Sequence, residues 1–253
     1  MDWLLPVMKY CSFLALACLT SAACADTFPG IFTGAGSWQN DLSGTLDAGT
    51  SVIDVEDDLR FEADRANTFY VALEHQIPGL PNVMANYSSL SAEGANRLHR
   101  SFDIKGIGFN VADDIATSLD LVQHDVVMYY ELLNNWLSVD AGLAVRWLDG
   151  EINTTSSSAY ASTRLDAPVP LFYGKARFDL PTSGLWVAAD GMGMSYDGNR
   201  ILDLRAVIGW DSQIGVGVEA GWRRYALTLE EFDQVDYADI EFEGPFAAFT
   251  YRF

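Results

Sequence analysis

Alternation of apolar and polar side chains along most of the chain restricts what this sequence can fold into. The last alternating stretch spans residues 236–253. On one parity it carries Pro245, Ala247, Phe249, Tyr251 and Phe253, and on the other Ala248, Thr250 and Arg252. Because successive side chains of a β-strand point to opposite faces, this pattern predicts a strand with one apolar face and one small or polar face.

The same period of two recurs upstream, and turn sequences divide the chain into ten predicted strands. They are residues 30–42, 66–76, 83–94, 118–131, 136–150, 166–180, 185–197, 200–211, 215–229 and 236–253. Short turns at 77–82, 132–135, 180–184 and 211–214 alternate with a tight turn at 197–200 and longer polar segments at 43–65, 95–117, 151–164 and 230–235. Short turns at one end and longer loops at the other are typical of transmembrane barrels, so the prediction is an all-β, antiparallel, up-and-down β-barrel. Residues 98–110 also alternate and are interpreted as a hairpin within a long loop.

The polar parity carries charges in the middle of several strands. Arg146 lies within the strand predicted at 136–150, and Lys175 and Arg177 within the strand at 166–180. A soluble sandwich turns its apolar face inward. In a membrane barrel the polar face lines the lumen and the apolar face meets lipid, which fits charges of both signs at mid-strand.

The predicted lumen charges form the main candidate site. Acidic and basic members are nearly balanced, and they are Glu74, Asp125, Glu131, Asp140, Asp179, Asp190, Asp203 and Glu219, with Arg146, Lys175, Arg177, Arg205, Arg223 and Arg252. Buried charges persist when they are paired and hydrogen-bonded, and the interior of a small barrel is filled by side chains. The favoured interpretation is a lumen plugged by charge pairs, with a structural role. A narrow pore for ions or small solutes is the alternative.

The amino-terminal residues 1–25 have the features of a cleaved signal peptide. A short apolar run at 11–19 follows Lys9, and Ala23-Cys24-Ala25 is a small-x-small cleavage sequence. The three cysteines of the chain all lie in this segment. We therefore expect residues 26–253 to form one barrel domain without disulfides.

The net charge of −20 argues against binding nucleic acid through bulk charge. Part of this acidity lies in a predicted loop with Asp54, Glu56, Asp57 and Asp58, followed by Glu62 and Asp64. Carboxylate oxygens suit hard cations, but the segment lacks the central glycine and ordered ligands of an EF-hand. It is either a solvated acidic loop or a weak site for divalent cations at the lipopolysaccharide surface. The sequence suggests no organic cofactor, since it has no Gly-rich phosphate loop.

Two other functional classes stay open at this stage. An outer-membrane enzyme would place its site in the long loops, where His99 precedes Asp103, Asp113 and Asp114; His75 lies beside a short turn, and His124 faces lipid in the predicted register. No nucleophilic triad follows from this spacing, so the prediction is not an enzyme. A soluble binding barrel of the lipocalin type would need an apolar interior.

Several motifs support the barrel interpretation by resemblance. The sequence ends on Phe253, with Tyr251 and Phe249 before it, which resembles the carboxyl-terminal assembly signal of bacterial outer-membrane barrels. Gly34-Ala-Gly-Ser-Trp-Gln39, Phe69-Tyr-Val-Ala-Leu-Glu-His75, Tyr129-Tyr-Glu-Leu-Leu-Asn-Asn-Trp136, Tyr173-Gly-Lys-Ala-Arg-Phe-Asp-Leu-Pro181 and Glu241-Phe-Glu-Gly-Pro-Phe246 are similar to those of an uncharacterised family of proteobacterial outer-membrane β-barrels, small barrels of the OmpA and OmpW kind. The resemblance implies outer-membrane localisation, with lipid, lipopolysaccharide and the barrel-assembly machinery as partners. It implies no activity.

Overall fold

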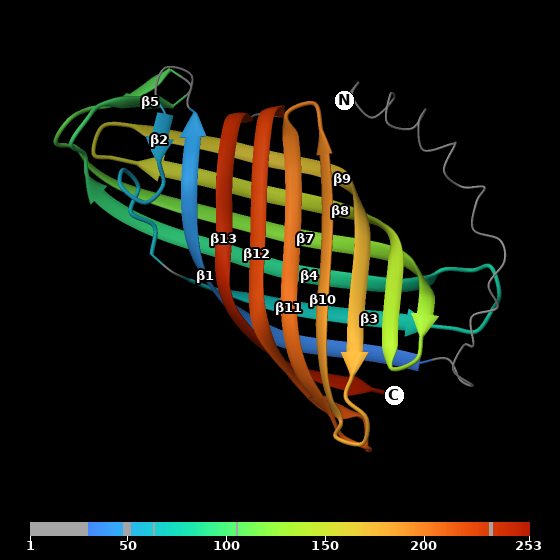
Figure 1. The fold of residues 1–253 in the computed structure, drawn as a ribbon. Helices are drawn as coiled ribbons and strands as arrows, with labels where there is room; N and C mark the ends of the chain where they lie inside the picture. The colour runs from blue at the N-terminus through green and yellow to red at the C-terminus, as the bar shows by residue number, and fades with distance from the viewer. Residues whose placement is uncertain (1–29, 48–51, 63, 105, 233–234) are drawn as a thin grey trace.

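The computed structural model describes residues 30–253 except 48–51, 63, 105 and 233–234. Within this part of the chain, ten antiparallel strands close into one barrel (Figure 1). They are β1 (Gly30–Asp47), β3 (Asp64–Glu74), β4 (Asn82–Arg97), β7 (Asp114–Asn134), β8 (Leu137–Thr155), β9 (Tyr160–Asp179), β10 (Leu185–Tyr196), β11 (Asn199–Asp211), β12 (Val216–Phe232) and β13 (Val235–Arg252). The last strand closes the ring by pairing with the first, for example at Thr33 and Tyr251. The predicted all-β fold is confirmed, while the predicted signal peptide lies outside the described residues.

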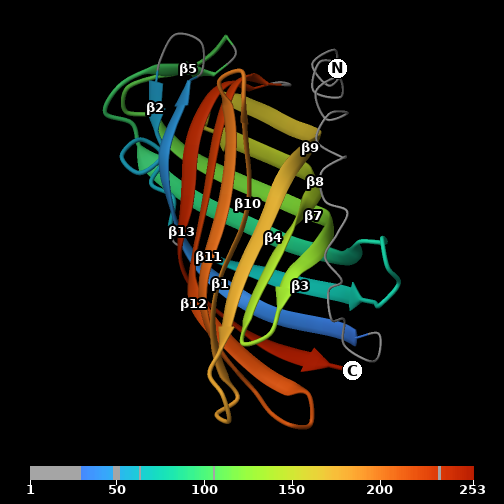
Figure 2. The same cartoon turned by 45° about the vertical axis from the view of Figure 1, so that its right-hand side comes forward.

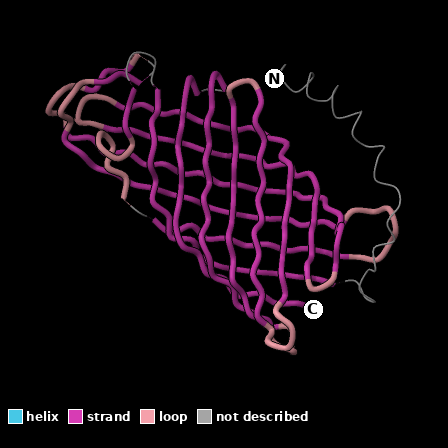
Figure 3. Tube along the Cα trace, viewed as in Figure 1, coloured by secondary structure: helices cyan, strands magenta, loops and turns pink. Residues whose placement is uncertain are grey.

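The two ends of the barrel differ as the turn lengths predict. At the inner end, which holds Gly30 and the carboxyl terminus, short connections join the strands (Figure 3). At the outer end lie β2 (Val52–Asp54), paired with β1, and the hairpin of β5 (Phe102–Ile104) and β6 (Ile107–Phe109) (Figure 2). This hairpin confirms the interpretation of residues 98–110.

The strands are longer at the outer end than the sequence predicts. Residues 151–164 were expected to form a polar loop, but β8 continues to Thr155 and β9 begins at Tyr160, paired in register throughout. The expectation fails because side chains alternate here as well: Arg164 is exposed, while Ile152 and Ala161 face the interior together with Thr154. With 19 to 21 residues, β7, β8 and β9 exceed the ~9–11 needed to cross a bilayer.

An apolar band surrounds the inner part of the barrel. Leu143 and Trp147 on β8, and Val218 and Trp222 on β12, lie on its outward face and are between 41% and 52% exposed. A closed barrel leaves no unpaired strand edge in hydrocarbon, and an outward apolar band with aromatic girdles is the exterior that lipid requires. The protein is therefore a β-barrel of the outer membrane. None of the described residues form a helix long and apolar enough to cross a membrane.

Toward the outer end, apolar and polar residues exchange faces, although the inward and outward positions continue to alternate. On β8, outward Trp147 is followed by outward Asp149, while the interior position between them is Leu148, which is fully buried. On β12, outward Arg224 follows Trp222, and buried Leu227 and Leu229 face inward. We define the inner zone as the part with a polar interior and apolar exterior, and the outer zone as the part with an apolar interior and polar exterior.

Candidate functional site in the barrel interior

Four charged side chains meet in the middle of the lumen and form the central cluster, defined as Asp125, Arg146, Asp203 and Arg223. Arg146 donates from Nε to Oδ1 of Asp125 at 2.7 Å and from Nη2 to Oδ2 of Asp203 at 2.8 Å. Arg223 donates to both oxygens of Asp203, at 2.9 and 2.7 Å. Since β8 and β11 are three places apart around the ring, the contact between Arg146 and Asp203 crosses the lumen.

Aromatic rings and neutral polar groups surround the central cluster. The guanidinium of Arg223 lies 4.5 Å from the ring centroid of Trp38, and that of Arg146 lies 5.3 Å from the centroid of Tyr225. Asn86 donates to Asp125 at 3.5 Å, and Arg223 to the hydroxyl of Ser88 at 3.4 Å. All four charges are buried, and fixed partners on several strands hold them there.

Strand register places a row of charges around the inner side of the cluster. Successive neighbours in the pairing of β7 to β12 are Glu131, Asp140, Lys175, Asp190, Arg205 and Arg223. Arg205 donates to Asp190 at 2.9 Å and lies 3.8 Å from Glu219, and Lys175 lies 3.9 Å from Asp140. Acids and bases that are far apart in sequence thus pair across adjacent strands.

The remaining predicted lumen charges lie nearer the inner end. Tyr129 donates its hydroxyl to Glu74 at 2.9 Å. Arg177 bridges Asp179 at 2.7 Å and Asp211 at 2.8 Å, with its guanidinium 4.2 Å from the ring centroid of Trp186. All fourteen predicted lumen charges line the polar interior, but in separate groups. Asp125, Arg146, Asp203 and Arg223 share the cross-lumen contact. Asp211 was missed because it ends its strand in a predicted turn.

Two cavities in the interior have no lining residue in common. A polar cavity of about 420 Å³ extends from residues at the inner turns, such as Ser212, to the central cluster. An apolar cavity of about 120 Å³ lies in the outer zone. Side chains at most 1% exposed fill the space between them, and this separating layer consists of Leu90, Gln123, Leu148, Tyr225 and Phe242. The obstruction is therefore a charge cluster backed by a packed layer.

Sequence analysis missed the separating layer and the apolar cavity. Much of the apolar cavity is lined by residues of the segments 43–65 and 151–164, which were predicted as polar loops, and the lumen was described by its charges alone. In the structure, the apolar residues change face within single strands. The available signal was the pair Trp147-Leu148, where an outward apolar residue is followed at once by an inward one. On β12, likewise, Trp222 is apolar and outward, whereas Tyr225 three residues later faces the interior.

The acidic loop is tied into the structure by its own carboxylates. Asp54 accepts hydrogen bonds from the backbone N–H groups of Glu56 and Asp57, both at 2.9 Å. Asp58 pairs with Arg100, whose hydrogen bond lowers the pKa of this carboxyl below its usual value. The described residues contain no group of three or more His, Cys, Asp or Glu arranged to hold a metal. Divalent-cation binding here stays a prediction.

The three histidines occupy separate parts of the barrel. His75 contacts the carbonyl of Pro81 at the inner turn, with 3.0 Å between Nε2 and the oxygen. His124 lies on the outward face of β7 with its ring 5.3 Å from that of Tyr87, as the predicted register requires. His99 is exposed in the outer loop.

The carboxyl-terminal aromatic residues lie on the lipid-facing exterior. Phe249 and Phe253 are 75% and 70% exposed, and Tyr251 packs edge-on against Phe253. The backbone N–H of Phe253 donates to the carbonyl of Ile31 at 2.9 Å, beside the seam that closes the barrel. The apolar parity of this strand therefore faces outward, as its alternation predicts.

Comparison with known proteins finds likeness only in structure. No protein-family model and no curated protein matches the sequence. The translocator domain of the autotransporter NalP from Neisseria meningitidis matches with 14% identity, a TM-score of 0.42 and coverage of 88% of both chains. The outer-membrane protease OmpT from Escherichia coli matches with 13% identity and a TM-score of 0.42, over 93% of this chain and 99% of that one. An outer-membrane channel from Pseudomonas putida F1 matches with 10% identity and a TM-score of 0.40, over 93% and 100%. Likeness at this level extends no activity to the present chain.

Proposed function

We propose that this outer-membrane barrel has a structural role and a lumen that is closed to steady ion flow. The observation that carries the proposal is that Arg146 joins Asp125, on the neighbouring strand β7, to Asp203 on β11 across the lumen. An ion passing this point must displace the guanidinium or share its carboxylates. Leaving a buried charge without its partner costs about 3–5 kcal/mol, so the closed arrangement is strongly favoured.

The separating layer supports the same proposal. Leu148, Tyr225 and Phe242 are fully buried beyond the central cluster, so a hydrated ion would have to displace closely packed side chains of this layer to pass. The polar cavity on the inner side then ends blindly at the cluster. A narrow passage for small solutes would require movement of both the cluster and the layer.

Conductance across planar lipid bilayers tests the proposal. We expect the wild-type barrel to show no steady channel current. The double substitution Arg146→Ala/Tyr225→Ala removes the bridge and one member of the separating layer, and should produce channel events.

A matched control removes side chains from the outward faces of the same two strands. Val145→Ala/Trp222→Ala should leave the bilayer current at the wild-type level. Heat-modifiable migration in gels confirms that each variant is folded before it is measured. Steady current through the wild type, unchanged by Arg146→Ala/Tyr225→Ala, would reject the closed lumen in favour of an open pore.

The partners in this proposal follow from the surface of the barrel. The apolar band would contact lipid, and the acidic outer end would meet lipopolysaccharide and its divalent cations. The exposed aromatic side chains of Phe249, Tyr251 and Phe253 would be read by the barrel-assembly machinery. Membership of the small OmpA- and OmpW-like barrels is part of the same proposal, and it rests on the sequence motifs.

A further inference from the structure

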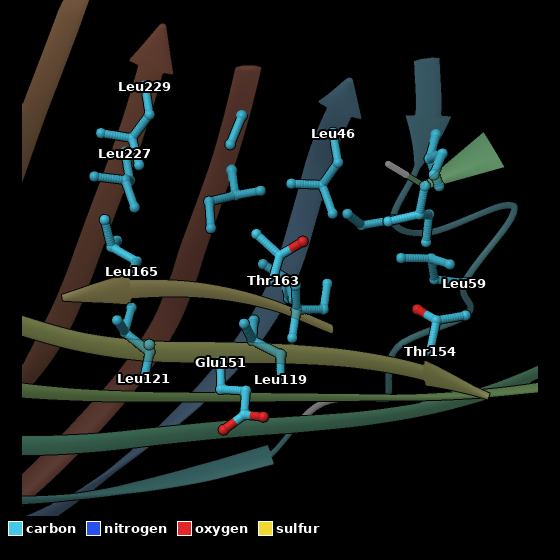
Figure 4. Close-up of a pocket in the computed structure, with 18 of the residues that line it drawn as sticks. Leu46, Leu59, Leu119, Leu121, Glu151, Thr154, Thr163, Leu165, Leu227 and Leu229 are labelled. Carbon is cyan, nitrogen blue, oxygen red and sulfur yellow. The ribbon is translucent and has the colours of Figure 1, made fainter. Parts of the chain in front are cut away.

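The apolar cavity of the outer zone is built from strands on opposite sides of the barrel. Leu119 and Leu121 of β7 line it from one side, and Leu227 and Leu229 of β12 from the other (Figure 4). Leu121, Leu227 and Leu229 are each at most 3% exposed. These side chains are well enclosed, yet they leave a volume of about 120 Å³ between them.

Three polar side chains of the wall, those of Thr154, Glu151 and Arg164, are engaged in hydrogen bonds. The hydroxyls of Thr154 and Thr117 lie 3.3 Å apart, within hydrogen-bonding distance. The carboxylate of Glu151 accepts from Ser162 and Arg164, both at 3.2 Å, and points away from the space in Figure 4. A buried water needs two to four polar partners, whereas apolar cavities stay dry. The walls therefore favour an apolar occupant over water.

A roof of ordered chain covers the cavity at the outer end. Residues 52–61 place Ile53, Val55 and Leu59 against it, each at most 2% exposed. Hydrogen bonds fix this roof to its surroundings: Val55 N–H donates to the carbonyl of Gly44 at 3.0 Å, and Arg100 donates to the carbonyl of Val52 at 2.6 Å. The cavity is thus a defined part of the fold.

We infer that the outer-zone cavity binds one small apolar molecule, of the size of a single aromatic ring. An apolar cavity of about 150 Å³ lined by Leu, Ile and Phe binds benzene in another protein, and the present cavity has similar walls and a similar volume. A long acyl chain exceeds this volume, and a charged solute would lose its hydration without gaining a charged partner, because Glu151 and Arg164 of the wall pair with each other. The site is separate from the central cluster, so the inference stands whether or not the lumen conducts.

Binding of fluorobenzene to the full-length mature barrel in lipid nanodiscs tests the inference, with ¹⁹F nuclear magnetic resonance as the readout. We expect a saturable signal at one equivalent per barrel, competed by toluene. Ala238 lines the cavity from β13 and is 4% exposed. Ala238→Leu fills the space and should weaken binding at least tenfold.

The matched control adds the same atoms to the outside of the same strand. Ala247 faces outward in the apolar band, so Ala247→Leu should bind fluorobenzene as the wild type does. A second variant, Leu227→Ala, enlarges the cavity and should let naphthalene compete better than it does against the wild type. The inference is overturned if fluorobenzene gives only the non-saturable signal of lipid partitioning. It is also overturned if folded Ala238→Leu binds as well as Ala247→Leu, or if Leu227→Ala leaves the competition by naphthalene unchanged.

Discussion

The inner and outer zones of this barrel are made by the same continuous strands but have opposite sidedness. In the inner zone, Leu143 of β8 faces outward and Arg146 faces the interior. A few residues later on the same strand, Asp149 faces outward and Leu148 faces the interior. The inner zone has the sidedness of a membrane barrel, and the outer zone has that of a soluble one.

The difference shows that the solvent around a strand decides which residue types lie on its outward and inward faces. Lipid surrounds the inner zone, so apolar residues are stable on its exterior and charges must pair inside. Water surrounds the outer zone, so burial of apolar side chains in its interior becomes favourable again. The two interiors consequently have different chemistry, with paired charges in one and an apolar cavity in the other.

Breaking the central cluster should have the largest effect on stability. Arg146→Ala leaves Asp125 without its bidentate partner and removes one partner of Asp203, so the free energy of unfolding should fall by about 3–5 kcal/mol. Asp125→Ala/Arg146→Ala should cost less than the single substitution, because Asp203 keeps Arg223 and no carboxylate is left unpaired. Urea unfolding from lipid vesicles measures both. A double variant that is less stable than Arg146→Ala would contradict charge pairing as the source of the effect.

A new charge on the exterior of one strand should lower the free energy of unfolding more in the inner zone than in the outer zone. Ala220 and Ala226 both face outward on β12, Ala220 in the apolar band and Ala226 beside Glu241 of β13. Ala220→Arg should lower the free energy of unfolding by about 2–4 kcal/mol, as for Arg near the bilayer midplane. Ala226→Arg should change it by less than about 0.5 kcal/mol, as for an ordinary surface substitution. If urea unfolding gave equal decreases in the free energy of unfolding for the two variants, the exterior would not change from lipid-facing to water-facing between these positions.

The roof of the outer zone should show a smaller, pH-dependent effect. Arg100 lowers the pKa of Asp58 in the folded protein, so the pair stabilises the roof above the unfolded pKa of about 3.9 and loses its contribution as pH falls through the lower, folded value. The pair is partly exposed, and its contribution should not exceed about 1 kcal/mol. Hydrogen exchange at the Val55 amide should therefore be less protected in Arg100→Gln than in the wild type at pH 7. The difference should shrink once Asp58 is protonated, leaving the contribution of the bond from Arg100 to the carbonyl of Val52. A difference that does not change with pH would show that the Asp58 pair is not its source.

Local sequence patterns were enough to predict the number of barrel strands and which face of each inner-zone strand is polar, but not how far the strands extend at the outer end. Alternation with period two is a local property of the chain, so Leu143 and Arg146 could be assigned to opposite faces without a partner strand. The turn sequences are local as well: Asp197-Gly198 has positive φ at both residues, as a two-residue hairpin turn requires.

Which charges meet, and where the interior becomes apolar, depends instead on contacts between strands that are far apart in the chain. Arg146 and Asp203 are 57 residues apart, and their contact depends on barrel closure and on the register of every strand between them. The outer-zone cavity likewise requires β7 and β12 to face each other across the closed ring, which no local pattern specifies. The pair Trp147-Leu148 is a local sign of the change, but the burial of Leu148 and Leu227 in one apolar interior depends on the alignment of all the strands and on the water that surrounds the outer zone.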